Sequence, residues 1–181
     1  MDVTSFNLLF ALLALAAMAG ALVGVLTLLV PAAPLRDLRL DIAATAPWFA
    51  FAIAAVATAG SLYYSEVAGF TPCKLCWFQR ICMYPQALVL GIAAVRRDRS
   101  AWQYALPLSV LGAGISIYHY QLQRFPAQTS GFCTLEAPCT AKEVDQFGFV
   151  TIPFMALSGF LLISVLLLVG RTRPAQEDLV P

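Results

Sequence analysis

The sequence predicts an all-α membrane protein: a four-helix transmembrane bundle preceded by one extra N-terminal transmembrane helix. Of its 181 residues, 60% are hydrophobic and only 12% are charged, whereas soluble domains carry charge on about 25% of their residues. Long stretches without Asp, Glu, Lys or Arg recur along the chain. A helix needs roughly 20 apolar residues to cross the hydrocarbon of a bilayer, because lipid offers the backbone no hydrogen bonds.

Five stretches of the sequence qualify as spans. In chain order they cover residues 3–35 (densest at 6–30), 42–65, 77–95, 100–123 and 146–170. The third is the weakest, because it contains Arg80 and Pro85. A proline inside a helix removes a backbone hydrogen bond, so we expect a kink there.

The first stretch differs from a cleaved signal peptide. Its start carries Asp2 and no Lys or Arg, whereas a signal peptide begins with positive charge and has a shorter apolar core. We therefore expect it to be retained as a helix. The chain then divides into the extra helix with its cytoplasmic connection (1–41), the bundle (42–170) with extracytoplasmic loops at 66–76 and 122–147, and a cytoplasmic tail (171–181).

The basic residues predict the orientation of the chain. If all five stretches span, seven arginines share one side: Arg36, Arg39, Arg96, Arg97, Arg99, Arg171 and Arg173. The other side has three basic residues, Lys74, Arg124 and Lys142, and Arg80 lies within a helix. Because positive charge is enriched on the cytoplasmic side, we expect the N-terminus outside and the C-terminus in the cytoplasm.

Cys73 and Cys76 form a C-x-x-C motif on the expected outer side, where disulfides persist. Such a pair opens and closes at modest cost and reacts through a thiolate. We expect Cys76 at the start of the third helix, where the helix dipole stabilises its thiolate, and Arg80 one turn later on the same face. Arg80 has an alternative to this role beside the thiolate: its long side chain extends to the membrane interface.

Two other roles of this motif stay open. A purely structural bond gains little from so small a ring, and a zinc site would need the second cysteine pair, because His119 is the only histidine. We favour redox chemistry and expect no metal.

The second pair, Cys133 and Cys139, lies in the loop at 122–147 with C-x5-C spacing. It is either a brace for an extracellular loop or a flexible, exposed disulfide that a partner protein reaches, which the nearby Gly131 and Pro138 favour. Thr140 and Glu143 have the spacing of a capping box, which predicts a short helix just after Cys139.

Several other side chains have candidate roles. His119, near the outer end of the fourth stretch, is either a partner for a ligand carbonyl or an interfacial residue among aromatics. Trp77 and Phe78 follow Cys76 directly and are candidates for the wall of a cofactor pocket, whereas Cys82 is expected to be a buried small hydrophobe. Aromatic residues near the helix ends are expected as interfacial anchors: Trp48, Tyr63, Tyr64, Trp77, Trp102, Tyr118 and Tyr120.

Three segments resemble the disulfide-bond-formation protein B (DsbB) family, in particular its BdbC branch. The first is TPCKLCWFQRICMYP at residues 71–85, and the others are YHYQLQ at 118–123 and FGFVTIPF at 147–154. The resemblance covers roughly residues 42–170. It implies a four-helix bundle in a bacterial plasma membrane, with a quinone (ubiquinone or menaquinone) at the outer rim and a thioredoxin-like, DsbA-like thiol oxidase as partner.

The resemblance also implies roles by position. Cys73 and Cys76 match the pair next to the quinone, with Cys76 and Arg80 nearest to it, and His119 matches a histidine in the same place. Cys133 and Cys139 match the loop pair that exchanges with the partner. The extra helix at 6–30 and the tight C-x5-C spacing depart from the family pattern.

These observations together predict a membrane thiol:quinone oxidoreductase that relays electrons from Cys133 and Cys139 to Cys73 and Cys76 and then to a quinone. Two alternatives stay open: an enzyme like vitamin K epoxide reductase, and a non-enzymatic metal-binding membrane protein. The net charge of +1 argues against a nucleic-acid partner, which would require a basic surface.

Overall fold

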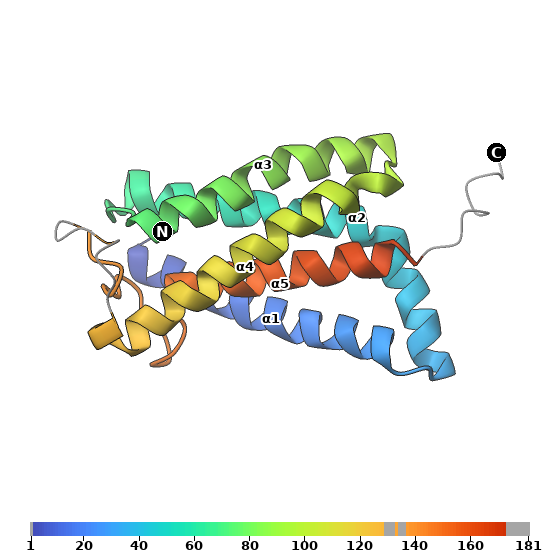
Figure 1. Cartoon of the computed structure of the whole chain (residues 1–181), viewed down its shortest axis with the longest axis horizontal. Helices are drawn as coiled ribbons and strands as arrows, with labels where there is room; N and C mark the ends of the chain where they lie inside the picture. The colour runs from blue at the N-terminus through green and yellow to red at the C-terminus, as the bar shows by residue number, and fades with distance from the viewer. Residues whose placement is uncertain (1, 129–132, 134–136, 173–181) are drawn as a thin grey trace.

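The computed structural model describes residues 2–128, 133 and 137–172 of the chain. Its helical elements are α1 (Val3–Leu29), α2 (Ala33–Leu62), the π-helical turn η1 (Tyr63–Val67), α3 (Lys74–Arg96), η2 (Arg99–Ala101), α4 (Trp102–Arg124), η3 (Pro126–Gln128) and α5 (Ile152–Gly170). Figure 1 shows α1, α3, α4, α5 and the larger part of α2 running along the long axis of the molecule. The prediction of an all-α membrane protein is confirmed.

Helix α5 occupies the centre of the bundle. It packs against α1, α2 and α4, while α3 packs against α2 and α4. Small residues allow this close packing, as in other membrane bundles. A Cβ atom at Gly112 of α4 would overlap the ring of Phe160 of α5, and one at Gly24 of α1 would overlap the side chain of Val165.

Four helical segments are long and apolar enough to cross a membrane: Val3–Leu29, Ala33–Val67, Lys74–Arg96 and Ile152–Gly170. Helix α4 has 23 residues but is not among them, because polar residues lower its hydropathy. Several of these are buried inside the bundle, namely Ser109, Ser116, His119 and Gln123. Exposed positions of α4 include Val110, Leu111 and Ile117. That α4 spans the membrane remains a prediction, which its apolar exposed side and buried polar residues support.

Two side-chain hydrogen bonds link α3 to α4 inside the bundle. Gln79 Nε2 donates to Ser116 Oγ at 3.0 Å, and Ser109 Oγ donates to Gln86 Oε1 at 2.7 Å. The partners are seven residues apart on each helix, which is about two helical turns. These two links fix the register of the antiparallel pair and place the polar residues of α4 away from lipid.

Helix α2 begins earlier than the sequence predicted. The charged residues of the expected connection, Arg36 to Asp41, belong to its first turns. Figure 1 shows this first part running at an angle to the rest of α2, across the end of α1. Pro47 lies inside the helix, and an internal proline is a common cause of such a bend.

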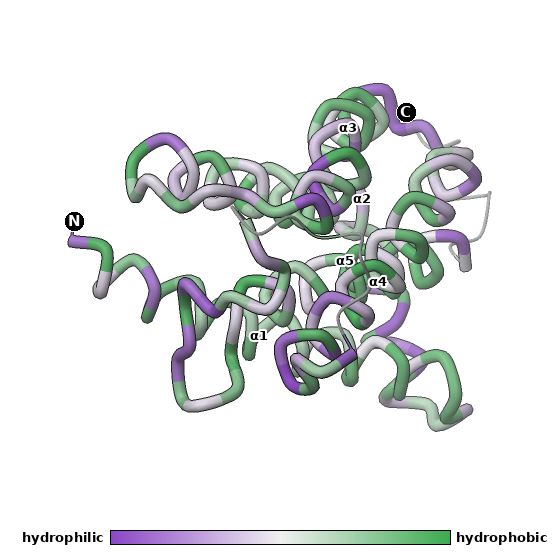
Figure 2. The backbone as a smooth tube through the Cα atoms, turned by 60° about the vertical axis from the view of Figure 1, so that its left-hand side comes forward, coloured by the Kyte–Doolittle hydropathy of each residue, from purple (hydrophilic) through white to green (hydrophobic). Residues whose placement is uncertain are grey.

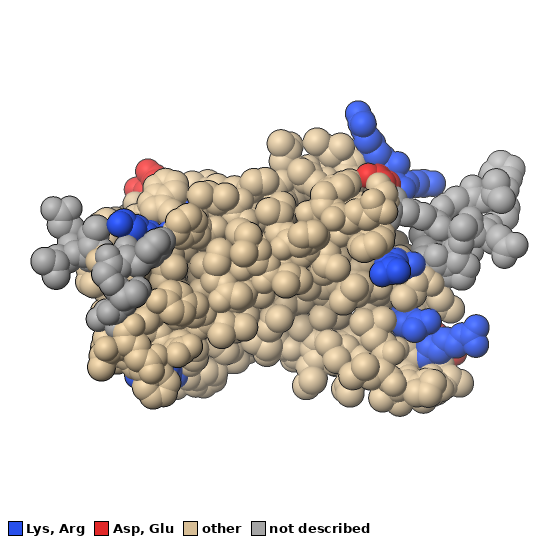
Figure 3. Space-filling model, in the orientation of Figure 1, with Lys and Arg blue, Asp and Glu red and all other residues tan. Residues whose placement is uncertain are grey.

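The charged residues lie at the two ends of the bundle. Figure 3 shows Lys, Arg, Asp and Glu at both ends of the long axis and an uncharged band between them on the face in view. Figure 2 shows hydrophobic colours along most of the helical tube, with hydrophilic colours concentrated near the ends of the helices and in the connections between them. This distribution is the one that a bilayer requires of a spanning bundle.

Candidate active site

The C-x-x-C motif lies at the N-terminal end of α3. Cys73 is the N-cap of the helix, and its Sγ accepts a hydrogen bond from the backbone N–H of Cys76 at 3.4 Å. The two Sγ atoms are 3.1 Å apart. Pro72, immediately before the cap, restricts the backbone ahead of it to an extended conformation. The N-terminal end of α3 therefore holds the two sulfur atoms close together.

Both cysteines of the motif lie at this helix terminus. Cys76 is in the first turn of α3, as expected, and Cys73 caps the helix and accepts a hydrogen bond from an N–H group of that turn. The hydrogen bond from the Cys76 thiol, assisted by His119 and opposed by burial, holds the pKa of the Cys73 thiol well below its usual value. Of the two sulfurs, Cys73 is therefore the one whose thiolate these contacts favour.

His119 reaches the motif from α4. Its Nε2 atom lies 3.7 Å from Cys73 Sγ. The side chain is only 2% exposed, and its Nδ1 atom is buried without a hydrogen-bond partner among the described residues. This position beside Cys73 argues against the alternative of an interfacial histidine among aromatic anchors. A neutral imidazole has one donor and one acceptor nitrogen, so one of the two still needs a partner.

Arg80 lies one turn beyond Cys76 and points into the bundle. Its guanidinium donates to Ser61 of α2, to Oγ from Nε and to the carbonyl oxygen from Nη2, both at 3.0 Å. It also lies over the rings of Trp77 and Tyr84, at 5.1 and 5.9 Å from their centroids. Arg80 therefore makes its polar contacts with α2. This arrangement differs from the alternative in which its side chain only reaches the membrane interface.

These side chains surround a cavity of about 330 Å³. A cavity of this size is within the range of small-molecule sites. Its lining includes Cys73, Cys76, Arg80 and His119. Within the part of the chain that the structure describes, three buried polar atoms of lining residues have no hydrogen-bond partner: Tyr64 Oη, His119 Nδ1 and Gln123 Oε1. Because buried polar groups normally find partners, these atoms indicate a polar ligand.

The second cysteine pair lies directly beside the first. Cys133 and Cys139 form a disulfide, with Cα atoms 5.8 Å apart. Cys139 is only 1% exposed and belongs to the same buried apolar cluster as Cys73, while Cys133 and Cys76 pack against that cluster as half-buried residues. The side chains of Cys73, Cys76, Cys133 and Cys139 therefore gather at one end of the bundle.

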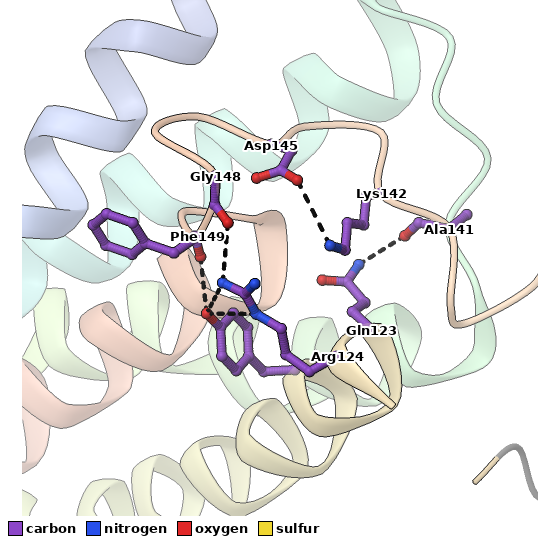
Figure 4. Close-up of polar contacts among 8 residues, drawn as sticks. Gln123, Arg124, Ala141, Lys142, Asp145, Gly148 and Phe149 are labelled. Carbon is purple, nitrogen blue, oxygen red and sulfur yellow. Dashed lines mark hydrogen bonds and ion pairs between the residues drawn. The ribbon is translucent and has the colours of Figure 1, made fainter. Parts of the chain in front are cut away.

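The loop after Cys139 is fastened to the end of α4. Figure 4 shows Gln123 and Arg124 pointing toward the loop segment that runs from Ala141 to Phe149. Gln123 Nε2 donates to the carbonyl oxygen of Ala141 at 2.7 Å, and Arg124 Nη2 donates to that of Gly148 at 3.1 Å. These bonds hold the loop over the cavity.

Two expectations for this loop are corrected. No helix follows Cys139: residues 141–145 are irregular, and the loop is held by α4 rather than by a capping box. The disulfide is also not fully exposed, because Cys139 is buried and only Cys133 retains partial exposure. Gly131, which was expected to give the loop flexibility, lies outside the described residues.

Several sequence-based assignments of the cavity wall also change. Trp77 and Phe78 are 53% and 41% exposed and do not line the cavity. Tyr64 is buried in the wall rather than anchored at the interface, whereas Cys82 is buried in the core as predicted. Reasoning from the sequence missed Gln79 and Gln123, which also line the cavity; polar residues within apolar stretches are the signal for such a site.

The same site offers three soft metal ligands. The ligand atoms of Cys73, Cys76 and His119 all lie within 4.8 Å of one another. Thiolate and imidazole are the ligands that zinc and copper prefer. The second cysteine pair cannot complete a four-cysteine site in this state, because its sulfurs are bonded to each other.

Comparison with known proteins agrees with this geometry. A family model described as disulfide bond formation protein DsbB matches residues 43–170. The chain is 51% identical over 111 residues to the probable disulfide formation protein C 1 of Bacillus cereus, covering 61% of this chain and 80% of that protein. It is 48% identical over 115 residues to the disulfide bond formation protein C of Bacillus subtilis, covering 62% and 83%. No solved structure matches the chain.

Proposed function

Because this chain belongs to the DsbB disulfide bond formation family, we propose that it is a membrane thiol:quinone oxidoreductase that reoxidises an extracytoplasmic thioredoxin-like thiol oxidase. The observation that carries the proposal is the clustering of four cysteines around one cavity. Cys73 and Cys76 line the cavity, and the Cys133–Cys139 disulfide packs against the same cluster. The match to the DsbB family favours this function over that of an enzyme like vitamin K epoxide reductase.

The first step is exchange between the partner and the loop. A thiolate of the partner attacks Cys133 Sγ, which is the more exposed sulfur of the loop disulfide, and Cys139 leaves as a thiolate. The second thiol of the partner then attacks the mixed disulfide. The partner leaves oxidised, and the two electrons and two protons remain on Cys133 and Cys139.

The second step transfers the electrons within the chain. A thiolate of the loop pair attacks Cys73 Sγ of the oxidised C-x-x-C pair, and Cys76 leaves as a thiolate. The other loop thiol resolves this bond and regenerates the Cys133–Cys139 disulfide, which leaves Cys73 and Cys76 reduced. The side chains of Cys73 and Cys139 already share one buried cluster, so the transfer requires only local motion of the loop.

The residues of the cavity fit a quinone ring. The unpartnered His119 Nδ1 is a candidate partner for a ring oxygen, and the Arg80 guanidinium supplies positive charge at the same wall. A quinone held there would supply the acceptor for the two electrons and two protons released as the Cys73–Cys76 disulfide re-forms. The chain itself would supply the groups that hold and orient it, namely the His119 imidazole and the Arg80 guanidinium.

The proposed orientation places this site outside the cytoplasm. Both cysteine pairs lie at the end of the bundle that has fewer basic residues, whereas Arg36, Arg96, Arg97 and Arg171 lie at the other end. In Figure 3, more Lys and Arg are visible at the end nearer the C-terminus. The positive-inside rule then places both pairs in the compartment where disulfides form.

A direct assay tests the function. Purified protein in detergent is mixed with a reduced DsbA-type oxidase and a short-chain benzoquinone, and the quinone absorbance is followed. We expect stoichiometric loss of quinone and of partner thiols. If partner thiols are oxidised without any loss of quinone, the assignment of the electron acceptor is wrong.

Metal binding by Cys73, Cys76 and His119 is the second candidate function, because their ligand atoms already converge. Metal analysis of protein purified without chelators, combined with thiol counting, separates the two. A bound metal in stoichiometric amount, together with no quinone reduction, would favour it. Metal-free protein that reduces quinone would exclude it.

A further inference from the structure

The helix that precedes the family match packs against the cavity wall. The family model begins at residue 43, so α1 lies outside it. Phe6 and Phe10 of α1 stack on each other, with ring centroids 4.5 Å apart. Phe6 also meets Tyr64 edge-on at 5.4 Å, and Tyr64 stacks on Phe70 at 5.6 Å. The aromatic cluster of Phe6, Phe10, Tyr64 and Phe70 therefore joins α1 to the π-helical turn and the chain that follows it.

Phe10 reaches the cavity because α2 carries a glycine opposite it. A Cβ atom at Gly60 would overlap the ring of Phe10. Both residues line the cavity, together with Tyr64 and Phe70. The ring of Phe10 from α1 thereby covers one side of the cavity. Without α1, the part of the chain that matches the family would leave this side to lipid.

Tyr64 presents an unsatisfied hydroxyl at this wall. Its side chain is 6% exposed, and its Oη atom has no hydrogen-bond partner in residues 2–128, 133 and 137–172. The residue lies in the π-helical turn Tyr63–Val67, and such turns are frequent at functional sites. Nearby hydroxyls of the same wall are satisfied, since Tyr84 Oη donates to Ser61 Oγ at 3.1 Å. Among the described residues that line the cavity, Tyr64 is therefore the one with a buried, unpaired hydroxyl.

We propose that α1 completes the quinone site: Phe10 seals the cavity against lipid, and Tyr64, held in place by Phe6 and Phe70, donates a hydrogen bond to an oxygen of the bound quinone ring. This inference rests on the proposed function. It assigns to α1 a role in ligand affinity rather than in exchange between the cysteine pairs, because the described cluster around Cys73 and Cys139 contains no α1 residue.

The test compares Tyr64→Phe and Phe10→Ala with two controls in the full-length protein. Tyr104→Phe makes the same change at the opposite end of the bundle, where the hydroxyl donates to Asp98. Phe49→Ala removes an exposed ring of α2 that does not line the cavity. Two quantities are measured with a short-chain benzoquinone: the KM and kcat of its reduction, and its equilibrium binding by quenching of tryptophan fluorescence.

We expect both cavity variants to raise KM and the dissociation constant about 3- to 10-fold, the loss that one hydrogen bond or one ring contact produces. Their kcat and their exchange with a reduced DsbA-type oxidase stay near wild type, and the controls stay within about 2-fold. If Phe10→Ala does not fold, Tyr64→Phe, which keeps the ring, decides alone. Unchanged quinone binding in Tyr64→Phe overturns this inference, whereas a wild-type protein that reduces no quinone overturns the proposed function itself.

Discussion

The Nε2 atom of His119 lies 3.7 Å from Sγ of Cys73, although the two residues are 46 positions apart in the sequence. The contact joins the only histidine of the chain to the cysteine that caps α3. It places an imidazole from α4 beside the C-x-x-C motif at the start of α3.

His119 is expected to help keep Cys73 ionised. The hydrogen bond from the Cys76 thiol is the larger cause of the lowered pKa of Cys73, and His119 adds to it. In reduced protein, the thiolate absorbance near 240 nm that depends on Cys73 should therefore persist below the usual pH range of a thiol and disappear as pH falls further. His119→Phe should shift this titration to higher pH.

The control for that titration is Cys73→Ser, which removes the signal at all pH values and so identifies its source. A titration of Cys73 that is the same in His119→Phe and in wild type would mean that the imidazole does not stabilise the thiolate.

Cys76→Ser should abolish quinone reduction while mixed disulfides with the partner still form at the loop pair. The reason is that the C-x-x-C disulfide cannot re-form without Cys76, whereas Cys133 and Cys139 are unchanged. Quinone absorbance and trapping of the mixed disulfide on a non-reducing gel measure the two steps separately. Cys82→Ala is the matched control, since Cys82 is buried in the core away from the cavity lining. Normal quinone turnover by Cys76→Ser would refute the relay.

Gly112→Ala should destabilise the bundle by about 1–3 kcal/mol, because the added methyl group overlaps the ring of Phe160 and forces repacking. Gly114→Ala, two residues along the same helix, meets nothing within 4 Å and should be neutral or slightly stabilising, since alanine favours a helix over glycine. Thermal unfolding of both variants in the same detergent makes the comparison. Equal melting temperatures would show that α4 and α5 are not packed this closely.

Gln86 and Ser109 should be energetically coupled. The hydrogen bond between them is 2.7 Å long and buried, so Gln86→Ala or Ser109→Ala leaves a polar group without its partner. Each should cost about 1–2 kcal/mol of unfolding free energy, and the double variant should cost less than the sum. Gln103→Ala, at an exposed position of α4, the helix that carries Ser109, serves as the control. Strict additivity would argue against the link.

The proposed sidedness predicts which positions a membrane-impermeant thiol reagent reaches. After mild reduction of intact cells, Cys133 should be labelled, because it is partly exposed at the outer end. A Ser100→Cys variant, with the new thiol at the exposed start of the segment leading into α4, should be labelled only after permeabilisation. The reverse pattern of labelling would invert the topology.

The sequence by itself determined the class of protein and the chemistry available to it. Lipid imposes a local rule on helix length and hydropathy, so spans are visible in single stretches of chain. The C-x-x-C motif is also visible in a single stretch of chain. The run of residues around Cys73 and Cys76 was enough to indicate the family. The early start of α2 and the irregular chain after Cys139 were missed, because bends and caps depend on contacts with other elements.

Only the tertiary structure decided which side chains meet. These helices are apolar on nearly all sides, so no hydrophobic period indicates which face turns inward. The approach of His119 to Cys73, the burial of Tyr64 beside Phe10 and the outward position of Trp77 all depend on how each helix is rotated against its neighbours. That rotation is set by close packing at residues such as Gly60 and Gly112, which acts between segments far apart in the chain.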